Sequence, residues 1–195
     1  MLRHTRVQEL TLNELARQVG LAKSNVLRYF ESREAVLLAL YDREYTAWLD
    51  AVEAALAVKT SVDVEVVADV IAREAASRPV FCDLCASAPG VLEHNVSADL
   101  AASYKRSAIA AAYRLAEIVG RYLGEFTPST GMIFVGGVNL AIGGVWASSQ
   151  PSRGMAAAYK ANADLRALRM DFAFMVREVV ATLLVGLEHR HTSRD

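Results

Sequence analysis

The sequence predicts an all-α protein in which an N-terminal helix-turn-helix unit precedes a larger helical domain. Three observations lead to this prediction. Apolar residues recur at intervals of three and four along most of the 195 residues, which is the spacing of helices with a buried face. Residues that cap helices stand before several of these runs. Alternating Val/Ile/Thr runs bounded by hairpin turns, which would indicate strands, do not occur.

The first helices are short and the third is long. Residues 11–14 read Thr-Leu-Asn-Glu, the S/T-x-x-E pattern of a capping box, and predict a helix that ends at Gly20. A second short helix is expected from Lys23 to Tyr29 or Phe30. Ser32 then precedes a helix expected over residues 33–58, whose apolar stripe has the helical period.

Further helices follow to the C-terminus. They are expected over residues 62–77, 81–86, 97–123, 129–150, 155–162 and 165–187. The segment from 165 to 187 is apolar on more than one face, which predicts burial on two sides. In a chain of this size we expect a second subunit on one of those sides; the alternative is a helix wholly inside one core.

Charge is distributed unevenly along the chain. Residues 1–33 carry six basic and three acidic side chains, a balance of +3, in a chain whose formal net charge is -1, so the remainder carries -4 (-1 minus +3). A basic end on an acidic body is expected when only that end meets nucleic-acid phosphates. No secretory signal precedes the two cysteines, and a reducing, cytoplasmic setting is therefore expected.

One segment resembles a membrane span in length. Residues 126–152 contain no charged side chain, and a run of that length could cross a bilayer. The segment also contains Pro128, five glycines, Asn139 and Gln150, and bulky aliphatic residues are few. A doubly buried helix of a soluble protein is the expectation, and no membrane association is predicted.

The spacing of three residues predicts a helix-turn-helix. Counted from Leu12, Ala16 is the fifth position, Gly20 the ninth and Val26 the fifteenth. A small residue is needed at the fifth position because the second helix crosses there. Glycine suits the ninth because the turn requires positive φ, and an apolar residue at the fifteenth packs the two helices together. Any two short helices joined by glycine could show this spacing, so the pattern alone is not decisive.

Residues 11–40 carry a more specific pattern. They read TLNELARQVGLAKSNVLRYFESREAVLLAL and resemble the signature of the tetracycline-repressor (TetR) family, in which the helix-turn-helix ends in an aromatic pair. The pair here is Tyr29-Phe30, and the basic-acidic-Ala-apolar run that follows it begins at Arg33. The resemblance implies a dimeric transcriptional repressor with a DNA-binding unit over residues 1–32 and a regulatory and dimerisation domain over residues 33–195.

The resemblance also implies which residues meet double-stranded DNA. They are Thr11, Lys23, Ser24, Asn25, Arg28, Tyr29 and Arg33. Thr11 and Arg33 would stand at helix N-termini, where backbone amides favour an anion. The sequence departs from the family at Ala22, where a Ser or Thr cap is usual. Only residues 1–9 remain for the family's first helix, which is therefore expected to be short or truncated.

The family's second domain usually encloses an effector, and ligand binding there changes the separation of the two DNA-reading units. The side chains expected to line such a pocket are Trp48, Phe81, Cys85, Tyr104, Tyr113, Asn139, Trp146 and Phe172. A homodimer through the last two long helices is expected, with release from a palindromic operator by a small molecule. The alternative is a DNA-binding protein controlled by a protein partner.

A thiol enzyme is the remaining alternative. Cys82-x-x-Cys85 matches half of a zinc site or a redox motif, but zinc needs two more ligands and His94 stands alone. A thioredoxin-like site needs a βαβ setting that the sequence lacks. Two small buried hydrophobic residues are the expectation, with no metal, no cofactor and no enzymatic activity.

Overall fold

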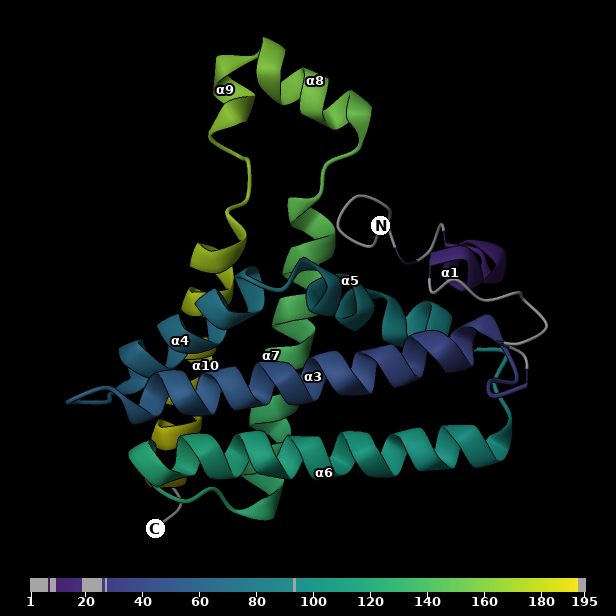
Figure 1. The fold of residues 1–195 in the computed structure, drawn as a ribbon. Helices are drawn as coiled ribbons and strands as arrows, with labels where there is room; N and C mark the ends of the chain where they lie inside the picture. The colour runs from purple at the N-terminus through teal and green to yellow at the C-terminus, as the bar shows by residue number, and fades with distance from the viewer. Residues whose placement is uncertain (1–6, 8–9, 19–25, 27, 93, 193–195) are drawn as a thin grey trace.

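The computed structural model describes residue 7, residues 10–18, residue 26, residues 28–92 and residues 94–192 (Figure 1). Every regular element within these residues is helical, which confirms the all-α prediction. The elements are α1 Leu12–Gln18, α3 Arg33–Ala57, α4 Val64–Ala76, α5 Pro79–Ser87, the π-helix η2 Ala88–Leu92, α6 Ala98–Leu123, α7 Pro128–Ser149, α8 Arg153–Ala161, α9 Ala163–Arg166 and α10 Phe172–Thr192.

Two long helices run beside each other through the molecule, and two others cross behind them. Figure 1 shows α3 and α6 alongside one another, with α7 and α10 crossing their direction. Helix α4 packs on α10, and α5 packs on α7. The core lies where these six helices meet, and its largest fully buried side chains include Trp48, Phe81 and Phe134.

Helix α3 connects the N-terminal residues to this core. The Ser32 hydroxyl accepts a hydrogen bond from the backbone N–H of Ala35 at 3.0 Å and thereby caps the helix. Tyr41, Tyr45 and Trp48 follow at helical spacing and are all buried. The helix therefore leaves the N-terminal unit at one end and is held in the core along the rest of its length.

The segment from 165 to 187, predicted as one helix, is two. Helix α9 ends at Arg166, and α10 begins at Phe172. The break has a local cause: the Asp171 carboxylate accepts a hydrogen bond from the backbone N–H of Phe174 at 2.8 Å, the contact by which an acidic residue starts a new helix. The glycine-rich helix likewise begins earlier than predicted, because Thr127 caps it and Pro128 occupies its first turn.

The short helix predicted over residues 81–86 is longer in the structure. Helix α5 begins at Pro79, where proline suits a first turn. The helical backbone continues through Pro89-Gly90 as the π-helix η2. This single wider turn carries the chain from α5 toward α6.

The glycines of α7 face different neighbours. A Cβ at Gly137 would lie 2.5 Å from Leu183 Cδ2 of α10, and a Cβ at Gly143 would lie 3.3 Å from Ala86 Cα of α5. The lack of a side chain at these two positions allows α10 and α5 to approach α7 closely. Gly136 and Gly144 have nothing within 4 Å of such a Cβ and lie on an open face of the same helix.

Helices α8 and α9 project beyond the rest of the molecule as an arm between α7 and α10 (Figure 1). They pack on one another, and neither contains a buried residue. Among the described helices, α7 alone is long and apolar enough to cross a membrane, and 33% of its most apolar window is buried in this chain. Core helices of soluble proteins meet the same criterion.

Candidate functional site

The described part of the helix-turn-helix begins with the predicted capping box. The Thr11 backbone N–H donates to Glu14 Oε2 at 2.7 Å, and the Glu14 backbone N–H donates to Thr11 Oγ1 at 3.2 Å. The Thr11 hydroxyl also donates to Glu14 Oε2 at 2.6 Å, and this bond, together with the one from the Thr11 backbone N–H, lowers the pKa of Glu14. The resulting negative charge at the start of α1 is favourable there.

The packing positions of the motif are buried and its outer positions are exposed. Ala16 and Val26 are both buried, as a crossing of two helices requires, whereas Gly20 lies outside the described residues. Arg28 is exposed, and the Tyr29 side chain is 77% exposed. Three other residues that the sequence assigns to DNA contact also lie outside the described residues, namely Lys23, Ser24 and Asn25.

Arg33 contacts the N-terminal segment of its own chain. Its guanidinium Nη2 donates to the backbone carbonyl of Val7 at 3.2 Å, and Nη1 lies 3.7 Å from Glu34. Its Nε is buried without a hydrogen-bond partner in the part of the chain that the structure describes. A phosphate contact by Arg33, which stays a prediction, would therefore compete with these intramolecular contacts.

Asp83 joins three parts of the fold. Its Oδ2 accepts a hydrogen bond from the backbone N–H of Val7 at 2.6 Å, and its Oδ1 accepts one from Trp146 Nε1 of α7 at 3.3 Å. The edge of the Trp146 ring meets Phe172 of α10 at 5.4 Å between centroids. No sequence motif pointed to Asp83, although its carboxylate is the one charge in the apolar segment 79–92.

A buried aromatic cluster, made of Tyr41, Tyr45, Trp48 and Phe81, lies between α3 and α5. The Trp48 and Phe81 rings stack with centroids 5.0 Å apart, and Tyr45 meets both rings edge-on. The Trp48 indole N–H is buried and has no partner among the described residues. A buried donor without an acceptor is a cost to the folded state.

Helix α7 supplies a polar residue at the edge of this cluster. The Tyr45 hydroxyl donates to Asn139 Oδ1 at 3.0 Å, and Cys85 Sγ donates to the Asn139 backbone carbonyl at 3.5 Å. Four of the predicted ligand residues therefore gather around Tyr45, which the sequence analysis did not choose; they are Trp48, Phe81, Cys85 and Asn139.

The remaining predicted ligand residues lie elsewhere. The Tyr104 ring is 6.5 Å from the Tyr41 ring and faces the outer side of the cluster. Trp146 and Phe172 form their own pair beside Asp83. Tyr113 is 47% exposed and lines a separate pocket of about 680 Å³ beside Phe126. The eight residues thus do not surround one cavity.

Both cysteines are buried, free thiols. Burial raises the pKa of Cys85 to about 11, and burial, with the neighbouring Cys85 and Asp83, raises that of Cys82 further. A thiol enzyme needs the opposite shift, since the thiolate is the nucleophile. No group of three His, Cys, Asp or Glu side chains that could hold a metal occurs among the described residues.

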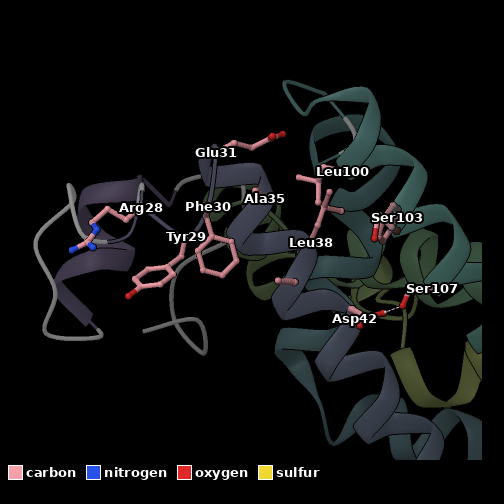
Figure 2. A pocket seen from close by; sticks show the side chains of 12 residues that line it. Arg28, Tyr29, Phe30, Glu31, Ala35, Leu38, Asp42, Leu100, Ser103 and Ser107 are labelled. Carbon is pink, nitrogen blue, oxygen red and sulfur yellow. Dashed lines mark hydrogen bonds between the residues drawn. The ribbon is translucent and has the colours of Figure 1, made fainter.

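An open cleft of about 590 Å³ lies between the N-terminal unit and the helical body (Figure 2). We call it the junction cleft. Its lining comprises Arg28, Tyr29, Phe30 and Glu31 from the N-terminal unit, Ala35, Leu38, Ala39 and Asp42 from α3, and Leu100, Ser103, Tyr104 and Ser107 from α6. Tyr104 is the one predicted ligand residue in it.

Helices α7 and α10 expose apolar side chains in this chain. They are Met132, Ile133 and Leu140 of α7 and Phe174, Val179 and Val185 of α10. The open glycines of α7, Gly136 and Gly144, are spaced one turn from Leu140 on either side. This apolar surface is not covered by any described residue of the chain itself.

The described residues form an all-helical body whose long helix α3 begins directly after the N-terminal residues, an arrangement typical of helical regulators. A family model described as the tetracyclin repressor-like C-terminal domain matches residues 42–191. The match covers most of the 195 residues, and the chain belongs to the tetracycline repressor-like family. This membership indicates a transcriptional regulator rather than an enzyme. No curated protein matches the chain significantly.

Proposed function

We propose that the protein is a cytoplasmic, homodimeric DNA-binding repressor that a small molecule releases from a palindromic operator. The observation that carries the proposal is the contrast at the N-terminal unit. Ala16 and Val26, the predicted packing positions of the motif, are buried, while Arg28 and Tyr29 are exposed. Exposed basic and aromatic side chains at the end of the recognition helix that the sequence predicts could reach phosphates and base edges in a major groove.

The dimer is supported by the exposed apolar surface of α7 and α10. Leu140 is 77% exposed and Phe174 58% exposed in the single chain. Large contiguous apolar surface on a soluble protein marks an interaction site, and a twofold dimer places the same surface of both subunits in contact. Two DNA-reading units related by that twofold axis would fit a palindrome with half-sites about 34–36 Å apart, or a multiple of that distance.

Effector control requires a path from a pocket to the DNA-reading unit. Helix α3 begins at Arg33, directly after the N-terminal unit, and is buried along the core side as far as Leu56. A ligand shifts the equilibrium only if it binds the DNA-competent and DNA-incompetent arrangements with unequal affinity. A pocket that touches both the N-terminal unit and α3 meets this requirement.

The test measures DNA binding by fluorescence anisotropy. The probe is a palindromic sequence found in the DNA upstream of the protein's own gene. Arg28→Ala and Asn25→Ala should lose sequence preference by about 1–3 kcal/mol if each reads a base. Lys23→Ala should weaken binding to all sequences and flatten the dependence on salt. Arg153→Ala removes an exposed arginine of α8 and should leave DNA affinity unchanged. If all four variants bound DNA with the same affinity and sequence preference, the assignment of these residues to DNA contact would be wrong.

A further inference from the structure

The junction cleft has walls from both parts of the molecule. Tyr29 and Phe30 stand on one side, and Ser103 and Ser107 of α6 stand on the other, with Leu38 of α3 between them (Figure 2). Its volume of about 590 Å³ lies within the range of small-molecule sites, about 300–1,000 Å³. A molecule in this cleft would touch the N-terminal unit, α3 and α6 at the same time.

The lining combines aromatic rings with carboxylates. Tyr29, Phe30 and Tyr104 contribute the rings. The ammonium of Lys105 already lies 5.5 Å from the centre of the Tyr104 ring, so Tyr29 and Phe30 are the rings offered to a ligand. Glu31 and Asp42 contribute two carboxylates, against one guanidinium from Arg28. In Figure 2 the Arg28 side chain points away from Asp42, toward the opposite side of the N-terminal unit. Aromatic faces and carboxylates both attract cations.

Local contacts hold both carboxylates in place. Glu31 Oε1 accepts a hydrogen bond from the backbone N–H of Ser97 at 2.6 Å, and this contact lowers the pKa of Glu31. Asp42 Oδ1 accepts a hydrogen bond from the Ser107 hydroxyl at 2.6 Å, which joins α3 to α6 at the edge of the cleft. Both carboxylates are therefore held in place by hydrogen bonds at the lining of the cleft.

We propose that the junction cleft is the effector site and that its ligand is a flat, largely apolar organic cation. The proposal rests on the proposed function for the consequence of binding. The ring system of the ligand packs between Phe30, Leu38 and Leu100, and its ammonium group lies toward Asp42 and Ser107. The effector site is thus at the junction, and the aromatic cluster behind it is structural core.

This position gives the ligand a direct effect on DNA binding. Tyr29 both lines the cleft and belongs to the residues that we expect on DNA. A ligand that fixes the distance between Tyr29 and α6 favours one placement of the N-terminal unit over others. Because the ligand contacts both sides, its affinity differs between placements, as linkage requires.

The experiment uses two probes of matched shape and opposite charge, 2-naphthylmethylammonium and 2-naphthylacetate. Binding to the full chain is measured by isothermal titration calorimetry without DNA. The cation should bind at least about tenfold more tightly than the anion. Asp42→Asn should remove most of this preference. Glu44→Gln, on the same helix but outside the cleft lining, should preserve it.

A second pair of variants tests the location. Ser103→Trp places an indole in the cleft and should abolish cation binding, whereas Ala110→Trp, also exposed on α6 but outside the lining, should not. Far-ultraviolet circular dichroism verifies that each variant folds. Equal binding of cation and anion would overturn the ligand class, and unchanged binding by Ser103→Trp would overturn the site.

The consequence for DNA is measured separately by anisotropy. Addition of the cation should release DNA from the unmodified protein and from Ala110→Trp, but not from Ser103→Trp. Cation binding that leaves DNA affinity unchanged would overturn the effector role while the DNA-binding proposal stands. A protein that binds the cation but no DNA would overturn the proposed function, and the calorimetry would still decide the ligand site.

Discussion

The backbone N–H of Val7 donates a 2.6 Å hydrogen bond to the Asp83 carboxylate, 76 residues later in the chain. The second oxygen of that carboxylate accepts from Trp146. The same acidic residue of α5 therefore holds the N-terminal segment and the helix that carries the proposed dimer surface. Since Arg33 donates to the Val7 carbonyl, both polar backbone groups of Val7 are fixed.

Asp83→Ala should release the N-terminal segment and destabilise the protein. The variant leaves the Val7 N–H and the Trp146 indole N–H without their acceptor, and each unsatisfied donor costs about 1–3 kcal/mol. Urea denaturation measures the loss. Trp146→Phe removes the indole N–H and part of the ring that packs on Phe172 but keeps the Val7 hydrogen bond. A loss of less than about 1 kcal/mol for Asp83→Ala would contradict the role given to Asp83.

Local patterns predicted most of the helices because their signals lie within a few residues. The capping box at Thr11 and the cap at Ser32 are both present as expected. The break before α10 was missed because apolar periodicity continues across it, although Asp171 provides the cap. The periodicity alone does not distinguish one long helix from two shorter ones in line.

The site was harder to predict than the fold. Large aromatic residues suggested a pocket, but Trp48 and Phe81 stack on each other and fill the space between α3 and α5. The junction cleft depends on how α3, α6 and the residues after α1 approach one another, and such contacts between distant segments have no local signature. Small residues such as Ser103 and Ala39 line it, and neither stands out in the sequence.

The buried thiols predict a loss of stability at alkaline pH. Burial raises the pKa of Cys85 from 9.0 to about 11, so the folded state favours the neutral thiol. The stabilisation is complete below pH 9 and is lost as pH rises toward 11. Urea unfolding between pH 8 and 10.5 should show this decline. In Cys85→Ala the free energy of unfolding should fall less steeply with pH, by up to about 1.4 kcal/mol per pH unit.

The same burial should make both thiols unreactive in the folded protein. Iodoacetamide at pH 7.5 should modify neither Cys82 nor Cys85 until denaturant is added, because both are buried and protonated. Rapid modification of the native protein would instead support a thiol with a function.

Two adjacent glycines of α7 should respond differently to the same substitution. Gly143→Leu places a side chain where Ala86 Cα lies 3.3 Å from the new Cβ. Helices α5 and α7 must then separate, at a cost of about 1–3 kcal/mol. Gly144→Leu meets no described atom within 4 Å and should leave the fold of the single chain intact. Urea denaturation compares the two in the Leu140→Asp background, which is expected to be monomeric, so that loss of a dimer does not contribute. Equal destabilisation there would contradict the close contact of α5 with Gly143.

Leu140 belongs to the exposed apolar surface of α7. The side chain is 77% exposed in the single chain, so replacing it should not disturb the core. In a dimer formed through α7 and α10 it becomes buried, and Leu140→Asp would place two unpaired carboxylates in the apolar interface. Such burial of charge is unfavourable enough to separate the subunits.

Leu140→Asp should therefore be monomeric by light scattering and retain its helical circular dichroism. Its affinity for a palindromic operator should fall by about 10²–10⁴-fold, because the two DNA-reading units are no longer joined. Leu168→Asp is the matched control: that side chain is 70% exposed in the turn after α9, away from the α7–α10 surface, and its replacement should leave both properties unchanged. A Leu140→Asp protein that remains dimeric would place the subunit interface elsewhere, and a monomer that binds the palindrome as tightly as the unmodified protein would remove the need for a dimer.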